Sequence, residues 1–426
     1  MTRFEHATRE TFSSLAVRNF RLFFCGQMIS QVGNWLTLIA QALLVLKLTG
    51  NGFAVGLLTA CQFLPVLLLG PWAGLVADRS DKRKLLVIVQ VFAMLQSFAL
   101  AALAFMSHPF VPGIYAVAFL GGIATAFDNP ARRSFVVEMV EGDKVNNAVS
   151  LNSALMTGSR IIGPALAGLL ISTVGYGWCF AVDGLTYIAV LVGYGLMDAS
   201  KFRPGPVAAR GRGQVRAGLR YALSVPELRI PLVMMSIIGT LAFNFSVVIP
   251  LLVKRSFGGS ESTFTILFSV ISVGSLIGAL TTARRTEIDL RHVVSAAAMF
   301  GVSMAVFAVA PNLAFAFPVG VVLGAASIGF MTASTAIVQM RSDPSMRGRV
   351  LALQAMVFLG STPIGGPILG AVCDWLGPRY GVGLGALSAI VAAAYGWSAS
   401  RRVDRPFASD AQIGMDTPIP PSVVAP

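Results

Sequence analysis

Twelve apolar runs dominate this chain, and they limit its possible folds more than any other feature. Each run is long enough to cross a membrane, because a hydrocarbon core of about 30 Å needs roughly 20 helical residues. They lie near residues 20–46, 53–77, 85–107, 111–128, 147–174, 178–198, 230–253, 263–283, 292–310, 313–338, 350–373 and 380–399. Backbone groups in lipid must bond within their own segment, so the runs predict helices. We therefore expect an all-α integral membrane protein with twelve spanning helices.

The composition agrees with this prediction. Of 426 residues, 55% are hydrophobic and 12% are charged, whereas soluble domains carry about 25% charged residues. The polar residues before the first span lack a small-residue cleavage site, so we expect no cleavable signal peptide. The four cysteines form no CxxC pair, which argues against disulfides and a zinc site.

The net charge of +13 is distributed as expected for a membrane protein, not for a nucleic-acid-binding protein. With both termini cytoplasmic, nearly all of the 32 Lys and Arg residues fall in cytoplasmic segments. The exceptions are Lys47, Lys254, Arg255 and Arg379 on the other side, and Arg160 within a span. This pattern follows the positive-inside rule. We expect a multi-pass protein of the cell membrane (inner or plasma membrane), with both termini cytoplasmic and no nucleic-acid partner.

A Gly-, Pro- and Arg-rich interval divides the spans into six and six. We expect a cytoplasmic linker there, with a short interfacial helix near residues 214–223. The predicted organisation is a cytoplasmic segment at 1–18, a six-helix bundle at 19–198, the linker at 199–229, a second bundle at 230–400 and a disordered cytoplasmic tail at 401–426.

The two halves look like a repeat. IIGPALAGLL at 161–170 aligns with IGGPILGAVC at 364–373, and each segment is followed by a glycine, Gly175 or Gly377. Parallel six-helix repeats are a transporter architecture. Chance similarity of Gly- and Pro-rich helices is the alternative, and the shared spacing favours a repeat.

The stretch GPWAGLVADRSDKRKLL at 70–86 places six charges directly after an apolar run. It resembles the loop between helices 2 and 3 of the major facilitator superfamily of secondary transporters, G-x-L-a-D-r-x-G-r-k. The matching positions are Gly74, Val76, Ala77, Asp78, Arg79, Asp81, Lys82 and Arg83. Val76 replaces the family's Leu, and Asp81 replaces its second Gly, which puts the family's tight turn in doubt.

The resemblance covers residues 14–400 and implies a cytoplasmic gate. In the family, the acid at Asp78 bonds to nearby bases and to the N-terminus of helix 11, which is expected near Arg349. Gly74 would allow close backbone approach. Arg79, Lys82, Arg83 and Asp128 would complete a latch that closes when the cavity faces outward. A solvated loop that only sets topology is the alternative.

Further segments resemble the subgroup of bacterial siderophore and macrolide exporters. They are NFRLFFCGQMISQVGNW at 19–35, LPVLLLGPWAG at 64–74, DNPARRSFVVEMV at 128–140 and NSALMTGSRIIGPALAG at 152–168. The last contains part of the drug-antiporter motif of helix 5, with Gly163, Pro164 and Gly168. Small residues allow close packing and Pro164 favours a kink. A packing motif without influence on transport direction is the alternative.

Polar residues within spans are costly and mark candidate sites. Gln27, Gln31, Asn34 and Gln41 share one face of the first span, which either lines a wet cavity or bonds to a neighbouring helix. Ser236, Thr240 and Asn244 form a weaker stripe in the seventh span, since Ser and Thr also bond to their own helix. We assign Asn152 and Asn244 to the same predicted substrate cavity.

Arg160 lies deep in the fifth span. An arginine at such depth needs a carboxylate, carbonyl groups or water beside it. It could bind an anionic substrate group or hold a coupling acid, and a structural ion pair with Asp183 or Asp128 is the alternative.

Proton coupling rests on the resemblance more than on these residues. Many relatives carry an acid where Asn34 stands, and the run AVAFLGGIATAF in the fourth span contains no base. The coupling candidates are therefore Asp183, Asp128 and Arg160.

No GK dipeptide occurs, so we expect no phosphate-binding loop and no ATP engine, and His6, His108 and His292 lie far apart. We expect no enzyme activity, no cofactor and no metal. The predicted function is export of a small amphipathic organic compound, siderophore-, macrolide- or drug-like, by a monomeric transporter driven by a proton or other ion gradient. An uptake carrier and a non-transporting sensor or accessory subunit are the alternatives.

Overall fold

The structure is a computed structural model that describes residues 12–203, 214–285, 288–343 and 346–403. Throughout these ranges the regular structure is helical, and twelve segments are long and apolar enough to cross a membrane. This confirms the predicted fold class. The expected N-terminal segment, linker and C-terminal tail lie partly outside the described residues.

The N-terminal half holds the first six spans. Its elements are η1 (Ser13–Ala16), α2 (Arg18–Thr49), α3 (Gly52–Arg79), α4 (Lys82–Phe105), α5 (Val111–Glu138), η2 (Gly142–Lys144), α6 (Val145–Thr173), α7 (Tyr176–Gly195) and η3 (Ala199–Lys201). The C-terminal half consists of α8 (Gln214–Ser224), α9 (Pro226–Leu241), α10 (Phe245–Leu251), η4 (Leu252–Ser256), α11 (Glu261–Ala283), α12 (Leu290–Ala308), α13 (Leu313–Arg341), α14 (Arg347–Gly360), α15 (Thr362–Trp375) and α16 (Pro378–Val403).

The seventh and eleventh spans are broken, where the sequence predicts continuous helices. The seventh consists of α9, α10 and the π-helical turn η4, and the break lies at Ala242–Asn244. The eleventh is divided into α14 and α15 at Ser361. Pro363 explains this second break, because it has no N–H to donate to the carbonyl of Leu359, four residues earlier.

The turn between α3 and α4 does not need the family's second glycine. Ser80 is extended, and Asp81 has a φ of −61° and caps α4 by accepting a hydrogen bond from the Lys84 amide at 3.1 Å. An aspartate favours this N-cap position. The departure at Asp81 therefore leaves the turn intact.

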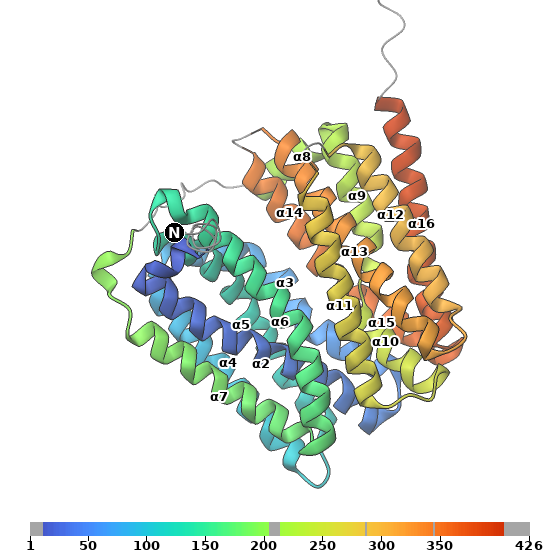
Figure 1. Cartoon of the computed structure of the whole chain (residues 1–426), viewed down its shortest axis with the longest axis horizontal. Coiled ribbons are helices and arrows are strands. Elements are labelled where there is room, and N and C mark those ends of the chain that lie inside the picture. Colours follow the sequence, from blue (N-terminus) through green and yellow to red (C-terminus); the bar gives the residue numbers. More distant parts are fainter. Residues whose placement is uncertain (1–11, 204–213, 286–287, 344–345, 404–426) are drawn as a thin grey trace, which may run out of the picture.

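The repeat is visible in the packing. Figure 1 shows the two halves side by side, with α3 against α15 and α6 against α11. Gly163 and Pro164 lie in α6, and their counterparts Gly366 and Pro367 lie in α15. The following glycines, Gly175 and Gly377, have φ angles of 93° and 104°, a region that disfavours other residues. The two halves are therefore pseudo-symmetric bundles.

The halves meet mainly at one side of the molecule. We call the side with η1, η2 and α8 the linker side, and the opposite side the far side (Figure 1). A Cβ atom at Gly56 in α3 would lie 2.3 Å from the Gly366 oxygen of the other half, whereas a Cβ at Gly70 or Gly74 would have nothing within 4 Å. The ribbons accordingly diverge toward the linker side in Figure 1.

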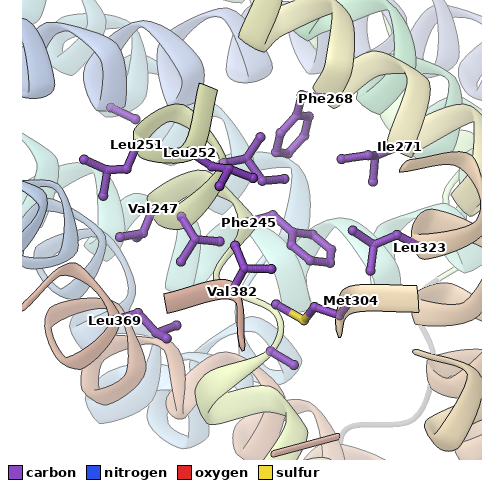
Figure 2. Close-up of a cluster of buried hydrophobic side chains, with 14 of the residues drawn as sticks. Phe245, Val247, Leu251, Leu252, Phe268, Ile271, Met304, Leu323, Leu369 and Val382 are labelled. Atoms are coloured by element: carbon purple, nitrogen blue, oxygen red, sulfur yellow. The ribbon is translucent and has the colours of Figure 1, made fainter. Parts of the chain in front are cut away.

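Buried apolar side chains fill the centre of the C-terminal half. Figure 2 shows side chains from α10, η4, α11, α12, α13, α15 and α16 packed together. The labelled residues are Phe245, Val247, Leu251, Leu252, Phe268, Ile271, Met304, Leu323, Leu369 and Val382. The broken seventh span is thus held in the middle of its bundle by apolar contacts.

Candidate transport site

The polar face of α2 is bonded inside the N-terminal half. Gln27 is 1% exposed and donates to the Tyr194 hydroxyl at 3.2 Å, and Gln31 donates to the Gln27 oxygen at 3.1 Å. Asn34 is exposed and accepts a hydrogen bond from Tyr187 at 2.9 Å. The buried Gln41 accepts one from Gln62 of α3. In this conformation these side chains hold neighbouring helices together, and lining of a cavity stays a prediction.

Arg132 joins this cluster, and the sequence analysis missed it. The fourth span was expected to end near residue 128, but α5 continues to Glu138 with Pro130 inside it. Arg132 is 6% exposed, donates to the Gln27 oxygen at 3.2 Å and lies 3.2 Å from the Asp128 carboxylate. Asp128 also accepts a hydrogen bond from Gln90 of α4 at 2.8 Å. The fourth helix therefore does carry a buried base.

Asp183 is enclosed by helices of its own half. It is 1% exposed, and its Oδ2 accepts hydrogen bonds from Thr37 of α2 at 2.6 Å and from Ser97 of α4 at 2.7 Å. Its Oδ1 has no hydrogen-bond partner and lies against Gly33, where a Cβ would be 2.4 Å away. Arg160 is not its partner, so the suggested ion pair between them is absent in this conformation.

Arg160 lies near the middle of α6 and makes no hydrogen bond or ion pair with any described residue. Its Cζ lies 5.9 Å from the centre of the Trp35 ring of α2. The suggested pair with Asp128 is also absent, because Asp128 bonds to Arg132 instead.

Two asparagines of the predicted cavity also have free bonding capacity. The Oδ1 atoms of Asn152 in α6 and of Asn244 at the break between α9 and α10 have no hydrogen-bond partner and are shielded from solvent. The Asn244 amide donates to the Thr240 carbonyl at 2.7 Å. Ser236 and Thr240 likewise donate hydrogen bonds to carbonyl groups of their own helix, which is the alternative to cavity lining given for these two residues.

The helix 5 motif lies at two packing contacts. A Cβ at Gly163 would be 2.3 Å from the Trp35 Cβ, so Gly163 allows α6 to approach α2. A Cβ at Gly168 would be 2.0 Å from the Thr265 hydroxyl of α11, in the other half. Pro164 is buried between them, within the helix.

The predicted gate residues on the linker side are separate from the C-terminal half here. Asp78 and Arg79 are exposed, and Asp78 has no bonded partner among the described residues. Lys82 pairs with Glu138 of α5 at 2.6 Å, and Arg83 donates to the Tyr194 carbonyl at 2.8 Å. These bases tie α4 to α5 and α7. A Cβ at Gly74 would have nothing within 4 Å, so the close backbone approach expected at Gly74 is not made in this conformation.

A second charged cluster, which the sequence analysis missed, joins the halves on the far side. The Asp374 carboxylate at the end of α15 accepts hydrogen bonds from the Gly52 and Phe53 amides of α3, both at 2.8 Å. Arg255 of η4 lies 2.8 Å from the same carboxylate and donates to the Gly50 carbonyl at 2.6 Å. We call Asp374, Arg255 and the Gly50–Phe53 backbone the far-side latch.

The far-side latch mirrors the gate expected on the linker side. There, Asp78 at the end of the second span is expected to face the start of the eleventh span, which is Arg347 in the structure. On the far side, Asp374 at the end of the eleventh span faces the start of the second. In both arrangements a carboxylate lies at the positive end of a helix of the other half.

The described residues contain no group of three or more His, Cys, Asp or Glu side chains that could hold a metal ion.

Comparisons with known proteins agree with this architecture. Residues 9–419 match the model of the family described as transmembrane secretion effector. The staphyloferrin A transporter of Staphylococcus aureus is 26% identical over 84% of this chain and 90% of its own length. Macrolide efflux protein A of Streptococcus pyogenes is 23% identical over 85% of this chain and 91% of its own.

A solved structure shows the same fold. It is a bacterial homolog of the human lysosomal transporter Spinster, in an inward-facing and unoccupied conformation. It has a TM-score of 0.67 at 15% identity and covers 90% of this chain and 96% of its own. With twelve spans in two pseudo-symmetric bundles, the chain belongs to the transmembrane secretion effector family of the major facilitator superfamily, whose members are membrane transporters and not enzymes.

Proposed function

We propose that this protein exports a small amphipathic organic compound by alternating access, as a proton antiporter in the cell membrane. The observation that carries the proposal is the one-sided packing of the halves: on the far side a Cβ at Gly56 would lie 2.3 Å from the Gly366 oxygen, whereas toward the linker side a Cβ at Gly70 or Gly74 of α3 would have nothing within 4 Å. A transporter that exposes its site to one side at a time needs such a one-sided contact, and a rocking motion of the halves would transfer it to the other side.

The basic residues support an orientation for this movement. The positive-inside rule places the linker side and both termini in the cytoplasm. The present conformation is then the one that takes up substrate from the cytoplasm. In the opposite conformation, Asp78 would approach the start of α14 at Arg347 and complete the linker-side gate.

Buried polar groups of the N-terminal half are the candidates for proton coupling. Asp128 is paired with Arg132 and bonded to Gln90, and Asp183 has one unbonded carboxylate oxygen. We assign coupling to this half, with Asp128 and Asp183 as the acids. The substrate would contact Asn152, Arg160 and Asn244, and the protein needs no cofactor and works as a monomer.

The names of the relatives support export of organic compounds. One similar protein is named as a transporter of staphyloferrin A and another as a macrolide efflux protein. At 23–26% identity these names suggest classes of compound for testing.

The test is substrate-induced proton movement in proteoliposomes that contain the purified protein and an internal pH dye. The panel holds siderophores, macrolides and cationic dyes, and empty liposomes are the control. Proton movement on addition of one compound class would support antiport. Flux of a compound without proton movement would contradict proton coupling, and no flux of any compound would contradict the export function.

A further inference from the structure

Arg160 is buried too deep in the membrane to be neutralised by lipid headgroups. It lies near the middle of the 29-residue helix α6, roughly 22 Å from the linker-side start of that helix at about 1.5 Å per residue. A charged side chain at this depth is costly unless it has a partner.

Among the residues that the structure describes, no carboxylate serves as a counter-ion for Arg160. The carboxylates buried within the described spans already have partners: Asp128 bonds to Arg132, Glu138 to Lys82 and Asp374 to Arg255. Asp183 accepts hydrogen bonds from Thr37 and Ser97. The Arg160 Nε has no hydrogen-bond partner, so the guanidinium keeps an unused donor in a low-dielectric region.

The surroundings of Arg160 are aromatic and lie where the halves meet. Its guanidinium is 5.9 Å from the Trp35 ring, and that ring is 6.0 Å from the Phe268 ring of α11 in the other half. Gly163 brings the Trp35 Cβ close to α6. Arg160 is half-buried, so part of its side chain remains accessible. A charge and two aromatic rings from both halves thus share one location.

We propose that Arg160 and Trp35 recognise the carboxylate and the attached apolar body of an organic anion, which is the substrate class of this transporter. The inference rests on the proposed function. A guanidinium presents two parallel N–H donors that match a carboxylate. Trp35, which packs against the buried Phe268, provides the apolar surface for the rest of the molecule. The carboxylate of the substrate then serves as the counter-ion of Arg160. A site with this unpaired positive charge binds organic anions more tightly than organic cations.

The test measures binding of three probes with the same ring system to the full-length protein in nanodiscs. The probes are 1-naphthoate, 1-naphthamide and 1-naphthylmethylammonium, and calorimetry gives their affinities. We expect naphthoate to bind most tightly. Arg160→Gln is expected to weaken naphthoate binding at least about 30-fold, the lower end for loss of one partner of a buried charge pair. Arg160→Lys keeps the charge but not the paired donors. Its affinity for naphthoate is expected to lie between those of the unmodified protein and Arg160→Gln.

Arg401→Gln is the matched control. Arg401 also lies over a tryptophan, with its Cζ 3.6 Å from the centre of the Trp397 ring, but it is exposed near the end of α16. Its replacement should leave all three affinities unchanged. Size exclusion and naphthamide binding show whether Arg160→Gln is folded. If it is not folded, the affinities of the three probes for the unmodified protein test the inference.

Equal binding of the three probes, tighter binding of the ammonium, or no naphthoate binding at millimolar concentration would overturn the inference. The inference would also be overturned if a folded Arg160→Gln variant bound naphthoate as tightly as the unmodified protein. If naphthoate binds through Arg160 but no compound drives proton movement in proteoliposomes, the anion site stands and the proposed antiport fails.

Discussion

The glycine contact between α3 and α15 predicts how the conformational equilibrium can be shifted. In Gly56→Ala the new Cβ would lie 2.3 Å from the Gly366 oxygen and 2.6 Å from its carbonyl carbon. Non-bonded heavy atoms pack at about 3.5 Å, so the two helices must separate by roughly 1 Å. Because both atoms belong to the backbone of the other half, no side-chain rotation can relieve the clash.

The cost of this separation falls on one conformation only. Overpacking of a tight contact costs about 1–3 kcal/mol, and Gly56 meets Gly366 only while the far side is closed. The substitution should therefore shift the equilibrium toward the far-side-open conformation by about 5- to 150-fold. The separation would also stretch the hydrogen bonds of Asp374 with the Gly52 and Phe53 amides, now 2.8 Å, beyond the usual limit of about 3.2 Å.

Hydrogen–deuterium exchange with mass spectrometry measures this shift on the full-length protein. In Gly56→Ala the far-side ends of α3 and α15 should exchange faster, and the linker-side ends of α3 and α14 more slowly. Gly70→Ala is the control, since it lies on the same helix and its Cβ would have nothing within 4 Å. Unchanged exchange in Gly56→Ala, or an equal shift in Gly70→Ala, would refute the packing argument.

Three further predictions concern single carboxylates. Asp374→Asn removes the charge from the far-side latch, and hydrogen bonds to a charged group contribute about 1.5–3 kcal/mol. The variant should therefore shift hydrogen–deuterium exchange in the same direction as Gly56→Ala. Unchanged hydrogen–deuterium exchange would contradict the role of the latch. Asp78→Asn should leave thermal stability within about 0.5 kcal/mol, since Asp78 is exposed and has no bonded partner here, but it should impair transport; full transport would contradict a linker-side gate. Asp183→Asn should stay folded, because the amide oxygen can accept from Thr37 and Ser97, while pH-driven flux falls; persistent flux would exclude Asp183 as the coupling acid.

The number of spans was predictable because hydrophobicity is a local property of the sequence. The ends of the spans were harder to predict from the sequence. The fourth helix continues through DNPARR because Asp128 and Arg132 neutralise each other and bond to Gln27 and Gln90, which come from other helices. Such pairing depends on tertiary contacts, so a polar stretch that is buried in this way is easily read as a loop.

The linker-side gate could be predicted from a motif, whereas the far-side latch could not. Asp374 and Arg255 are distant in sequence, and neither lies in a recognised motif. One signal was nevertheless available, because Arg255 is among the few bases that depart from the positive-inside distribution. A base on the side where bases are rare indicates a local partner, which here is Asp374.

The pair of Asp128 and Arg132 also bears on how this protein is made. The two residues are four apart on one helix and lie 3.2 Å from each other, so they can neutralise each other as soon as α5 is helical. During biosynthesis, this pair can therefore enter the bilayer already neutralised, whether or not Gln27 of α2 and Gln90 of α4 have packed against it.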